Sequence, residues 1–242
     1  MPLNNPQLRP LPQSLPELVI FDLDGTLVDS VPDLAAAIDE LLTELDCPPA
    51  GIERVRLWVG NGASVLVRRA LAWSGGADEL GVDDVEVDSA RHQTALQSFL
   101  RHYGALSGQK TALYAGVIEA LQRLTRSGVA MGVATNKPSQ FVPYVLQHSG
   151  IGEFFHNWLG GDCLPEKKPD PAPLLKLIEQ AGVSPERTLM VGDSSSDIRA
   201  ARAAGVPCLA VTYGYNHGRP VEEEQPDWVC DNLDTWFAQL KS

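Results

Sequence analysis

Three aspartates fall within one short stretch near the start of the chain. The stretch is VIFDLDGTLVDS, residues 19–30, and it contains Asp22, Asp24 and Asp29. The apolar run before it predicts a short buried strand over residues 18–22, so Asp22 and Asp24 lie at the mouth of that strand. Burying a carboxylate costs free energy unless a cation meets it. The stretch therefore predicts a site that holds a positively charged partner.

Further polar residues follow later apolar runs in the same way. In chain order, the polar residues at or just after predicted strand ends are Asp22, Asp24, Thr135, Asn136, Lys137, Lys168, Asp193 and Asp197. In open α/β sheets, ligands bind outside the carboxyl ends of the strands. We therefore expect carboxylates, a hydroxyl and one or two lysines to converge on one edge of the sheet.

This set of residue types predicts phosphoryl chemistry. Clustered carboxylates without His or Cys favour a hard cation, and Mg²⁺ binds one or two carboxylates together with substrate phosphate and water. The lysine and the hydroxyl are suited to hold an anion. A carboxylate can act as a nucleophile and form an aspartyl-phosphate. Positive charge from the metal and the lysine makes attack by an anion on an anionic phosphate feasible.

The elements that position these residues alternate strictly in the second half of the chain. Helices are predicted over residues 116–128, 139–149, 171–182, 197–205 and 232–240. Strands are predicted over residues 129–135, near 155–162, and over 188–193, 208–214 and 227–230. Such alternation predicts an α/β fold with a Rossmann-like, doubly wound parallel sheet covered on both faces.

A helical stretch interrupts this pattern after the first strand. Helices are predicted over residues 32–45, 63–73 and 88–104, and the acidic, glycine-containing residues between the last two are predicted to form a loop. We therefore expect an α/β core made of residues 17–31 and 106–242, with a small helical cap inserted as residues 32–105. Residues 1–16 are rich in proline and are expected to form a flexible tail.

Composition limits the classes of partner. The chain has 242 residues and a formal net charge of −12, which repels nucleic acid and anionic membranes. It has four cysteines, none in a C-x-x-C pair, and no apolar run approaches the ~20 residues of a membrane span. The first sixteen residues lack the apolar region of a signal peptide. We therefore expect a cytoplasmic protein that binds neither nucleic acid nor membranes. The phosphoryl chemistry predicted above adds a small phosphorylated metabolite as the partner, bound by a monomer or a small homo-oligomer.

Four short stretches resemble the ordered motifs of the haloacid-dehalogenase-like phosphatase superfamily. They are FDLDGTLVDS, VATNK, KKPDP and GDSSSDI. Further stretches, including WVGNGASVLVRRAL and LAVTYGYNHG, resemble the bacterial branch of that superfamily that hydrolyses 2-phosphoglycolate, and the likeness covers roughly residues 17–230. The resemblance implies a core with a small helical cap and a Mg²⁺-dependent phosphomonoesterase that forms an aspartyl-phosphate. Ala115 departs from the proline that relatives often have there, which affects the cap linker alone.

The resemblance also implies roles for individual residues. Asp22 matches the nucleophile, and Asp24 matches the acid that protonates the leaving group and then activates water. The implied metal ligands are Asp22, the backbone carbonyl of Asp24, and Asp193. The residues implied to bind the substrate phosphate are Thr135, Asn136 and Lys168, with Lys168 also orienting Asp22. The implied supporting residues are Gly25, Thr26 and Asp197.

Several alternatives stay open at this stage. Lys167 could exchange roles with Lys168 on sequence grounds, because only the family register separates them. The glycine-rich VGNGA turn, residues 59–63, has N–H groups that could meet an anion, and Arg68 or Arg69 could clamp a substrate carboxylate, although a solvated helix face is the simpler interpretation. His217 could lie at the rim of the site. A phosphatase for another small metabolite, or a sugar-phosphate mutase, would use the same residues.

Overall fold

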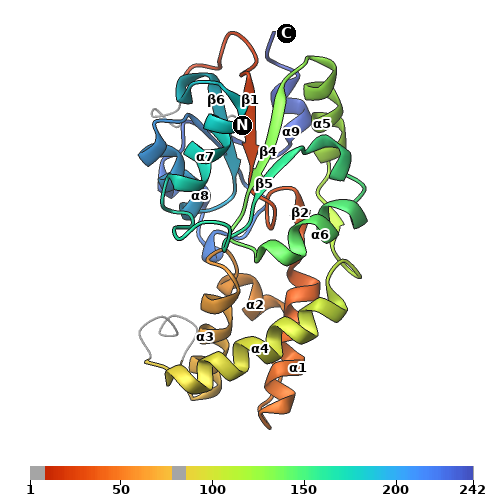
Figure 1. Ribbon diagram of the computed structural model, residues 1–242, viewed down its shortest axis with the longest axis vertical. Coiled ribbons are helices and arrows are strands. Elements are labelled where there is room, and N and C mark those ends of the chain that lie inside the picture. The colour runs from red at the N-terminus through yellow and green to blue at the C-terminus, as the bar shows by residue number, and fades with distance from the viewer. Residues whose placement is uncertain (1–8, 78–85, 242) are drawn as a thin grey trace.

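The computed structural model describes residues 9–77 and 86–241, and its centre is a six-stranded parallel sheet (Figure 1). In spatial order the strands are β5 (Asn157–Leu159), β4 (Ala130–Ala134), β1 (Leu18–Phe21), β6 (Thr188–Gly192), β7 (Cys208–Val211) and β8 (Trp228–Cys230). The first strand along the chain is thus central, and it pairs in parallel with β4 on one side and β6 on the other. The carboxyl ends of these three strands meet at one edge, as the sequence predicts.

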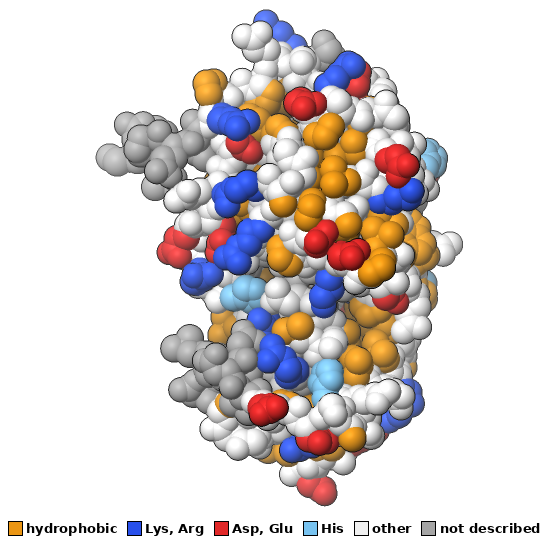
Figure 2. All heavy atoms as spheres, turned by 60° about the vertical axis from the view of Figure 1, so that its left-hand side comes forward, with side chains coloured by type: hydrophobic (Ala, Val, Ile, Leu, Met, Phe, Trp, Pro, Cys, Tyr) orange, Lys and Arg blue, Asp and Glu red, His pale blue; other side chains and the backbone are white. Residues whose placement is uncertain are grey.

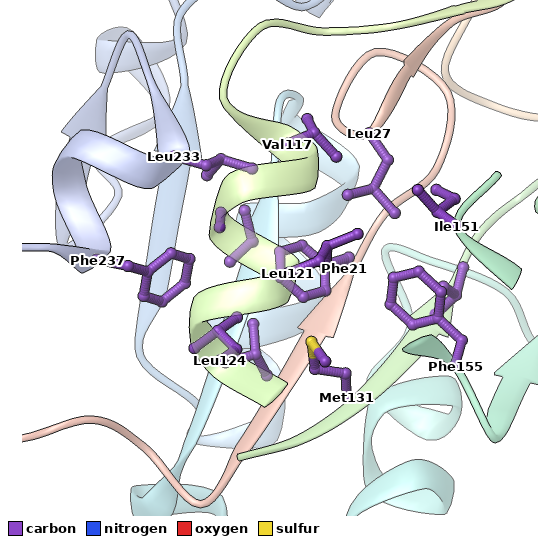
Figure 3. Packing of buried hydrophobic residues seen from close by; sticks show 14 of the residues in the cluster. Phe21, Leu27, Val117, Leu121, Leu124, Met131, Ile151, Phe155, Leu233 and Phe237 are labelled. Carbon is purple, nitrogen blue, oxygen red and sulfur yellow. The ribbon is translucent and has the colours of Figure 1, made fainter. Parts of the chain in front are cut away.

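Helices cover both faces of the sheet. One face carries α5 (Val117–Arg126), α6 (Val142–His148) and α9 (Leu233–Phe237), and the other carries α7 (Ala172–Ala181) and α8 (Ser195–Ala204). Successive side chains of a strand point to opposite faces. Accordingly, Phe21 joins the apolar cluster under α5, which Figure 3 shows, while Ile20 joins the cluster under α7 and α8. The doubly wound α/β architecture predicted from the sequence is confirmed.

Four helices gather at the carboxyl ends of the strands, and we call them the helical segment. They are α1 (Val31–Glu44), α2 (Ile52–Trp58), α3 (Ala63–Ser74) and α4 (Ser89–Leu106). They bury a separate apolar cluster of their own, to which Phe141 and Tyr215 of the sheet part also belong. The predicted helices over residues 32–45, 63–73 and 88–104 correspond to α1, α3 and α4, whereas α2 was not predicted. It follows Gly51, whose φ of 78° is a conformation that favours glycine.

Two very short strands join the helical segment to the sheet. These strands, β2 (Val28–Asp29) and β3 (Ala112–Leu113), pair antiparallel, so the chain leaves and returns at one place. Asp33, in the first turn of α1, is 1% exposed and fixes the returning chain. Its carboxylate accepts hydrogen bonds from the backbone N–H groups of Gly108, Lys110 and Thr111 at 2.9–3.0 Å, and from the Thr111 hydroxyl at 2.7 Å.

The first described residues lie along the surface beside the last strand. The Trp228 indole donates to the backbone carbonyls of Arg9 and Pro10, and the Arg9 side chain pairs with Asp227. The flexible tail predicted for residues 1–16 includes residues 1–8, which lie outside the described residues, as does part of the predicted acidic loop, residues 78–85.

The charges on the surface and the apolar character of the helices agree with the residue composition. On the face drawn in Figure 2, acidic and basic side chains are interspersed with hydrophobic ones. Within the described part of the chain, no helix has the length and apolar character needed to cross a membrane.

The buried Asp33 carboxylate makes a stability prediction. Replacing it by alanine leaves three partly buried N–H groups and the Thr111 hydroxyl without their acceptor, so we expect Asp33→Ala to lower the free energy of unfolding by about 2 to 3 kcal/mol. Urea unfolding followed by circular dichroism measures this loss. Glu40→Ala, at an exposed position of the same helix, is the matched control and should change stability by less than about 0.5 kcal/mol. A loss as small as the control's would show that the Asp33 contacts do not hold the returning chain.

Candidate active site

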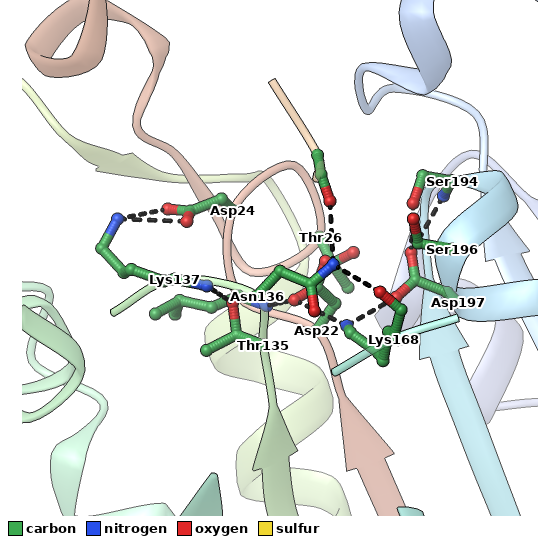
Figure 4. A network of polar contacts seen from close by, with 12 residues as sticks. Asp22, Asp24, Thr26, Thr135, Asn136, Lys137, Lys168, Ser194, Ser196 and Asp197 are labelled. Carbon is green, nitrogen blue, oxygen red and sulfur yellow. Dashed lines mark hydrogen bonds and ion pairs between the residues drawn. The ribbon is translucent and has the colours of Figure 1, made fainter. Parts of the chain in front are cut away.

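The centre of the candidate site is a buried chain of three charged groups at the carboxyl edge of the sheet. Asp22 follows β1 directly, and its Oδ1 lies 2.9 Å from the Lys168 ammonium and accepts the N–H of Leu23 at 2.7 Å. The same ammonium lies 2.6 Å from Asp197 Oδ1. Lys168 and Asp197 are 2% and 0% exposed. Lys168 therefore contacts two carboxylates at once, as Figure 4 shows.

Asp197 lies in the first turn of α8, and contacts at the start of this helix fix its carboxylate. Its second oxygen, Oδ2, accepts the backbone N–H groups of Asp193 and Ser194 and the Ser194 hydroxyl, which forms a capping box at the helix start. Gly192 makes room for this carboxylate, because a Cβ at Gly192 would collide with it. The capping box thereby holds Asp197 against Lys168.

A third carboxylate, Asp193, completes the acidic group. It accepts the Thr26 hydroxyl at 2.7 Å and the backbone N–H of Tyr215 at 2.8 Å. A Cβ at Gly25, whose φ is +91°, or at Gly214 would collide with the Asp193 carboxylate. Thr26 thus supports Asp193, and the two glycines let the backbone approach it closely.

Burial makes these carboxylates electrostatically costly. It raises the pKa of Asp22 to about 7, against the opposing attraction of Lys168. It also raises the pKa of Asp193 well above its usual range, and repulsion from Asp197 and Asp22 adds to the shift. Burial opposes the charge of Lys168, but attraction to Asp197 and Asp22 outweighs it and keeps the pKa above its ordinary value. The cluster has more negative charge than Lys168 offsets.

A divalent cation fits this excess of negative charge. One carboxylate oxygen from each of Asp22, Asp193 and Asp197 lies within 4.8 Å of the other two. An all-oxygen donor set suits Mg²⁺, which binds through few carboxylates. Asp197 is the most heavily engaged of the three, because Lys168 contacts its Oδ1 and three further hydrogen bonds end at its Oδ2, whereas Asp193 accepts two hydrogen bonds. The residues present therefore fit the metal that the sequence predicts.

Asp24 has a different partner from Asp22. Its carboxylate lies 2.8 Å and 3.1 Å from the Lys137 ammonium, and its Oδ1 accepts the Ser30 hydroxyl at 2.6 Å. Lys137 is 4% exposed, and attraction to Asp24 outweighs burial and raises its pKa above the ordinary value. The two aspartates are therefore held by two different buried lysines, on opposite sides of the view in Figure 4.

Thr135 and Asn136 follow β4 between these two ion pairs. The Thr135 hydroxyl accepts the backbone N–H of Lys137 at 3.2 Å and retains its own hydrogen as a donor. The Asn136 amide donates to the carbonyls of Lys168 at 2.9 Å and Gly60 at 3.2 Å. Asn136 thus ties the loop that carries Lys168 to the helical segment.

The VGNGA turn of the helical segment closes over the edge of the sheet. The Asn61 amide donates to the Ser196 hydroxyl, and the Lys167 ammonium donates to the Asn61 carbonyl at 2.9 Å. The structure thus separates the two adjacent lysines: Lys168 lies in the acidic group, and Lys167 holds the turn. His217 contacts the Leu57 carbonyl, and Arg69 donates to the Trp58 carbonyl, so both contact the helical segment.

A small cavity of about 40 Å³ lies between the strand ends and the helical segment. Its polar wall contains residues from the sheet edge, namely Asp22, Asp24, Thr135, Asn136 and Lys137. Its apolar wall contains a side chain from in or beside each helix of the segment, namely Leu34, Val59, Leu66 and Phe99. Asp22 and Asp24 of the opening motif thus line one cavity.

Sequence reasoning assigned no individual role to three residues of this site. Lys137 and Ser30 both contact the Asp24 carboxylate. Tyr215 contacts the Asp193 carboxylate. Lys137 had a visible signal, because it directly follows Thr135 and Asn136 at a strand end. Tyr215 contributes its backbone N–H, which no side-chain pattern reveals.

The comparisons with known proteins agree with this geometry. Residues 19–211 match the family model described as haloacid dehalogenase-like hydrolase. The chain belongs to that family. The resemblance predicted from the four motifs is confirmed, and the protein is an enzyme of the hydrolase class.

Curated relatives show a closer similarity. The chain is 55% identical to phosphoglycolate phosphatase of Pseudomonas putida over 222 residues, which are 92% of this chain and 79% of the relative. It is 54% identical to phosphoglycolate phosphatase 1 of Pseudomonas aeruginosa over 219 residues, 90% of this chain and 78% of the relative. A crystal structure described as a predicted phosphoglycolate phosphatase from Haemophilus somnus 129PT is 37% identical, with a TM-score of 0.84, and the match covers 95% of this chain and 99% of that one.

The raised pKa of Asp22 predicts how stability depends on pH. Between the ordinary pKa near 4 and the folded value of about 7, the folded state keeps a proton that the unfolded state releases, so stability falls as pH rises through this window. In EDTA, we expect raising the pH from 5 to 8 to lower the melting temperature of the wild type more than that of Asp22→Asn, by roughly 5 °C.

Thermal unfolding of both proteins in EDTA and in Mg²⁺ measures this difference. Mg²⁺ should stabilise the wild type more at pH 8 than at pH 5, because the metal binds the ionised carboxylates. Equal pH dependence in the wild type and Asp22→Asn would contradict the electrostatic interpretation.

Proposed function

We propose that the protein is a Mg²⁺-dependent phosphomonoesterase that hydrolyses 2-phosphoglycolate to glycolate and phosphate through an aspartyl-phosphate. The observation that carries the proposal is that two aspartates line the same cavity and that each is held by a different lysine. Asp22 is held by Lys168 and Asp24 by Lys137. One carboxylate is thereby placed to attack phosphorus and the other to exchange a proton with the leaving group. The named relatives support the substrate.

Asp22 is the proposed nucleophile. Its Oδ1 accepts hydrogen bonds from Leu23 and Lys168, which leaves Oδ2 to attack the phosphorus atom. Lys168 and the Thr135 hydroxyl hold the phosphoryl oxygens and offset their charge. The product of this step is a phosphoryl group covalently bound to Asp22.

Asp24 is the proposed acid and base. It protonates the alkoxide oxygen as the bond to phosphorus breaks, and then takes a proton from the water that attacks the aspartyl-phosphate. The contacts with Ser30 and Lys137 fix the orientation of its carboxylate for both steps.

Asp22, Asp193 and the backbone carbonyl of Asp24 are the proposed Mg²⁺ ligands. When bound there, Mg²⁺ would supply the positive charge that keeps Asp22 ionised and offsets the charge on the phosphate. Gly25, Thr26 and Asp197 position these ligands through the contacts described above.

The helical segment is the proposed cap, and it encloses the substrate. Its apolar side chains and the closed VGNGA turn exclude bulk water from the phosphoryl step. The small volume of the cavity favours a substrate with a short leaving group. We propose that residues 32–105 move against the rest of the chain to admit substrate and release product.

Phosphate release from a substrate panel tests the proposed reaction. The panel contains 2-phosphoglycolate, 3-phosphoglycerate, glucose phosphates and nucleoside monophosphates, each with Mg²⁺ and with EDTA. We expect a strong, EDTA-sensitive preference for 2-phosphoglycolate. Preference for another compound would leave the mechanism in place and replace the substrate, and isomer formation without phosphate release would identify a mutase.

The nucleophile makes a sharper prediction. Asp22→Asn removes the attacking oxyanion, so we expect kcat to fall at least roughly a thousandfold. The exposed Asp231→Asn is the matched control and should retain wild-type activity. Mass spectrometry of acid-quenched wild type should find a phosphorylated peptide that contains Asp22. Full activity of Asp22→Asn would rule out the covalent step.

Cap motion has its own measurement. The linkers near residues 28–32 and 105–114 contain the two-residue strands β2 and β3, and the Asp33 carboxylate holds three backbone N–H groups of the second linker. We expect vanadate, which mimics the phosphoryl group, to slow hydrogen exchange in both linkers and to leave β6 unchanged. Matching exchange with and without vanadate would count against closure at these linkers.

A further inference from the structure

The cavity places one positive charge beside the leaving-group side of the site. Among the described residues that line it, Lys137 alone is cationic. Lys137 is buried, so its charge is shielded from bulk water, and an isolated ammonium there would be costly. Asp24 supplies one anionic partner at 2.8 Å. The rest of the wall that faces the sheet edge is apolar, so an anionic leaving group would find its counter-charge at Lys137.

The helical segment completes the surroundings of this lysine. The Tyr103 ring of α4 lies over the ammonium, with 4.8 Å between Nζ and the ring centroid, a cation–π contact. The Tyr103 hydroxyl is buried close to Lys137 and Ser107, and among the described residues it makes no hydrogen bond of good geometry. Tyr103 also lines the cavity. A cation and a spare hydroxyl therefore lie together, one from each side of the cavity.

The leaving group of 2-phosphoglycolate carries a carboxylate, and the proposed reaction would put that carboxylate close to Lys137. Asp24 must contact the oxygen that bridges phosphorus and carbon, and Lys137 contacts Asp24 directly. In 2-phosphoglycolate a single methylene separates that oxygen from the carboxylate, so the carboxylate lies within a side chain's reach of Asp24. An ammonium has three N–H donors, and the contacts with the two Asp24 oxygens leave one for the substrate.

We propose that Lys137 and Tyr103 recognise a carboxylate on the carbon next to the phosphoester oxygen, and so select phosphorylated 2-hydroxy acids. The proposal rests on the proposed function, because it names the part of that substrate that the site reads. Lys137 is thereby a specificity-determining residue that comes from the sheet part of the molecule. Two nearby cations are engaged elsewhere: Arg69 donates to the Trp58 carbonyl and Lys167 to the Asn61 carbonyl.

A pair of matched substrates isolates this contact. Ethyl phosphate has a methyl group where 2-phosphoglycolate has its carboxylate, so the ratio of their kcat/KM values measures recognition of the carboxylate. Lys137→Met should lower this ratio by about 10- to 100-fold, the loss expected for one hydrogen bond to a charged group, with most of the change in KM. Tyr103→Phe, which keeps the ring, should lower it by a smaller factor.

Control variants separate recognition from general effects. Lys137→Arg keeps the charge and should retain most of the preference for 2-phosphoglycolate. Lys176→Met removes an exposed lysine on α7 and should leave the ratio unchanged. Circular dichroism checks that each variant is folded, and Lys137→Gln replaces Lys137→Met if the latter does not fold.

Inhibition gives a readout that needs no turnover of the probe. 3-Phosphonopropionate has a methylene in place of the bridging oxygen of 2-phosphoglycolate, and propylphosphonate lacks its carboxylate. The wild type should bind the first more tightly than the second, and Lys137→Met should lose this difference.

Each alternative outcome has its own meaning. An equal fall of kcat on both substrates in Lys137→Met would show that Lys137 only positions Asp24, and would overturn the proposed recognition while leaving the proposed function intact. A wild type that hydrolyses ethyl phosphate as well as 2-phosphoglycolate would contradict both the recognition and the proposed substrate. No hydrolysis of either compound would contradict the proposed function itself.

Discussion

Three carboxylates and one ammonium are buried together where β1, β6 and the loop before α7 meet, and their charges do not balance. Lys168 lies against Asp22 and Asp197, while Asp193 relies on the Thr26 hydroxyl and the Tyr215 N–H. The surplus of negative charge explains why burial raises the pKa of Asp22 and Asp193. It is also what a hard divalent cation would offset. The proposed metal site and the proposed nucleophile thus depend on one electrostatic constraint.

The same constraint determines how the remaining parts are arranged. Asp24, two residues after Asp22, cannot share Lys168, and a second buried lysine, Lys137, holds it instead. This separation suits the proposed roles, in which one carboxylate is the nucleophile and the other the acid. The helical segment lies over both and makes contact through its VGNGA turn with Ser196 and Lys167. Asp33 keeps its two connections side by side, so the segment remains in register with the sheet edge.

Much of the architecture could be predicted because it depends on local patterns. Apolar runs that end in Asp22, Thr135 and Asp193 identify the central strands and the edge where they meet, and the structure brings these residues together. The pair β2 and β3 escaped prediction because two residues are too few to show a period. Helix α2 escaped because two of its seven residues are buried, which leaves a weak apolar stripe.

The missed parts of the site depend on contacts between distant residues. The pairing of Lys137 with Asp24 joins positions 113 residues apart. In the sequence, Tyr103 looks like an ordinary apolar residue of α4. Only the structure, which places its ring over the Lys137 ammonium, distinguishes it. The choice between Lys167 and Lys168 likewise needed three dimensions, because neighbouring residues of a loop point in different directions.

The two walls of the cavity differ in how freely they can change. On the sheet side, Gly25 and Gly214 touch the Asp193 carboxylate so closely that any side chain there would displace it. On the opposite side, Leu34, Val59, Leu66 and Phe99 are apolar side chains that touch none of the charged groups by hydrogen bond or ion pair. Natural variation or laboratory evolution can therefore change the apolar wall of the cavity through the helices while the charged contacts at the sheet edge stay intact. A library of variants at these four apolar positions is therefore the most direct way to obtain variants that accept other substrates.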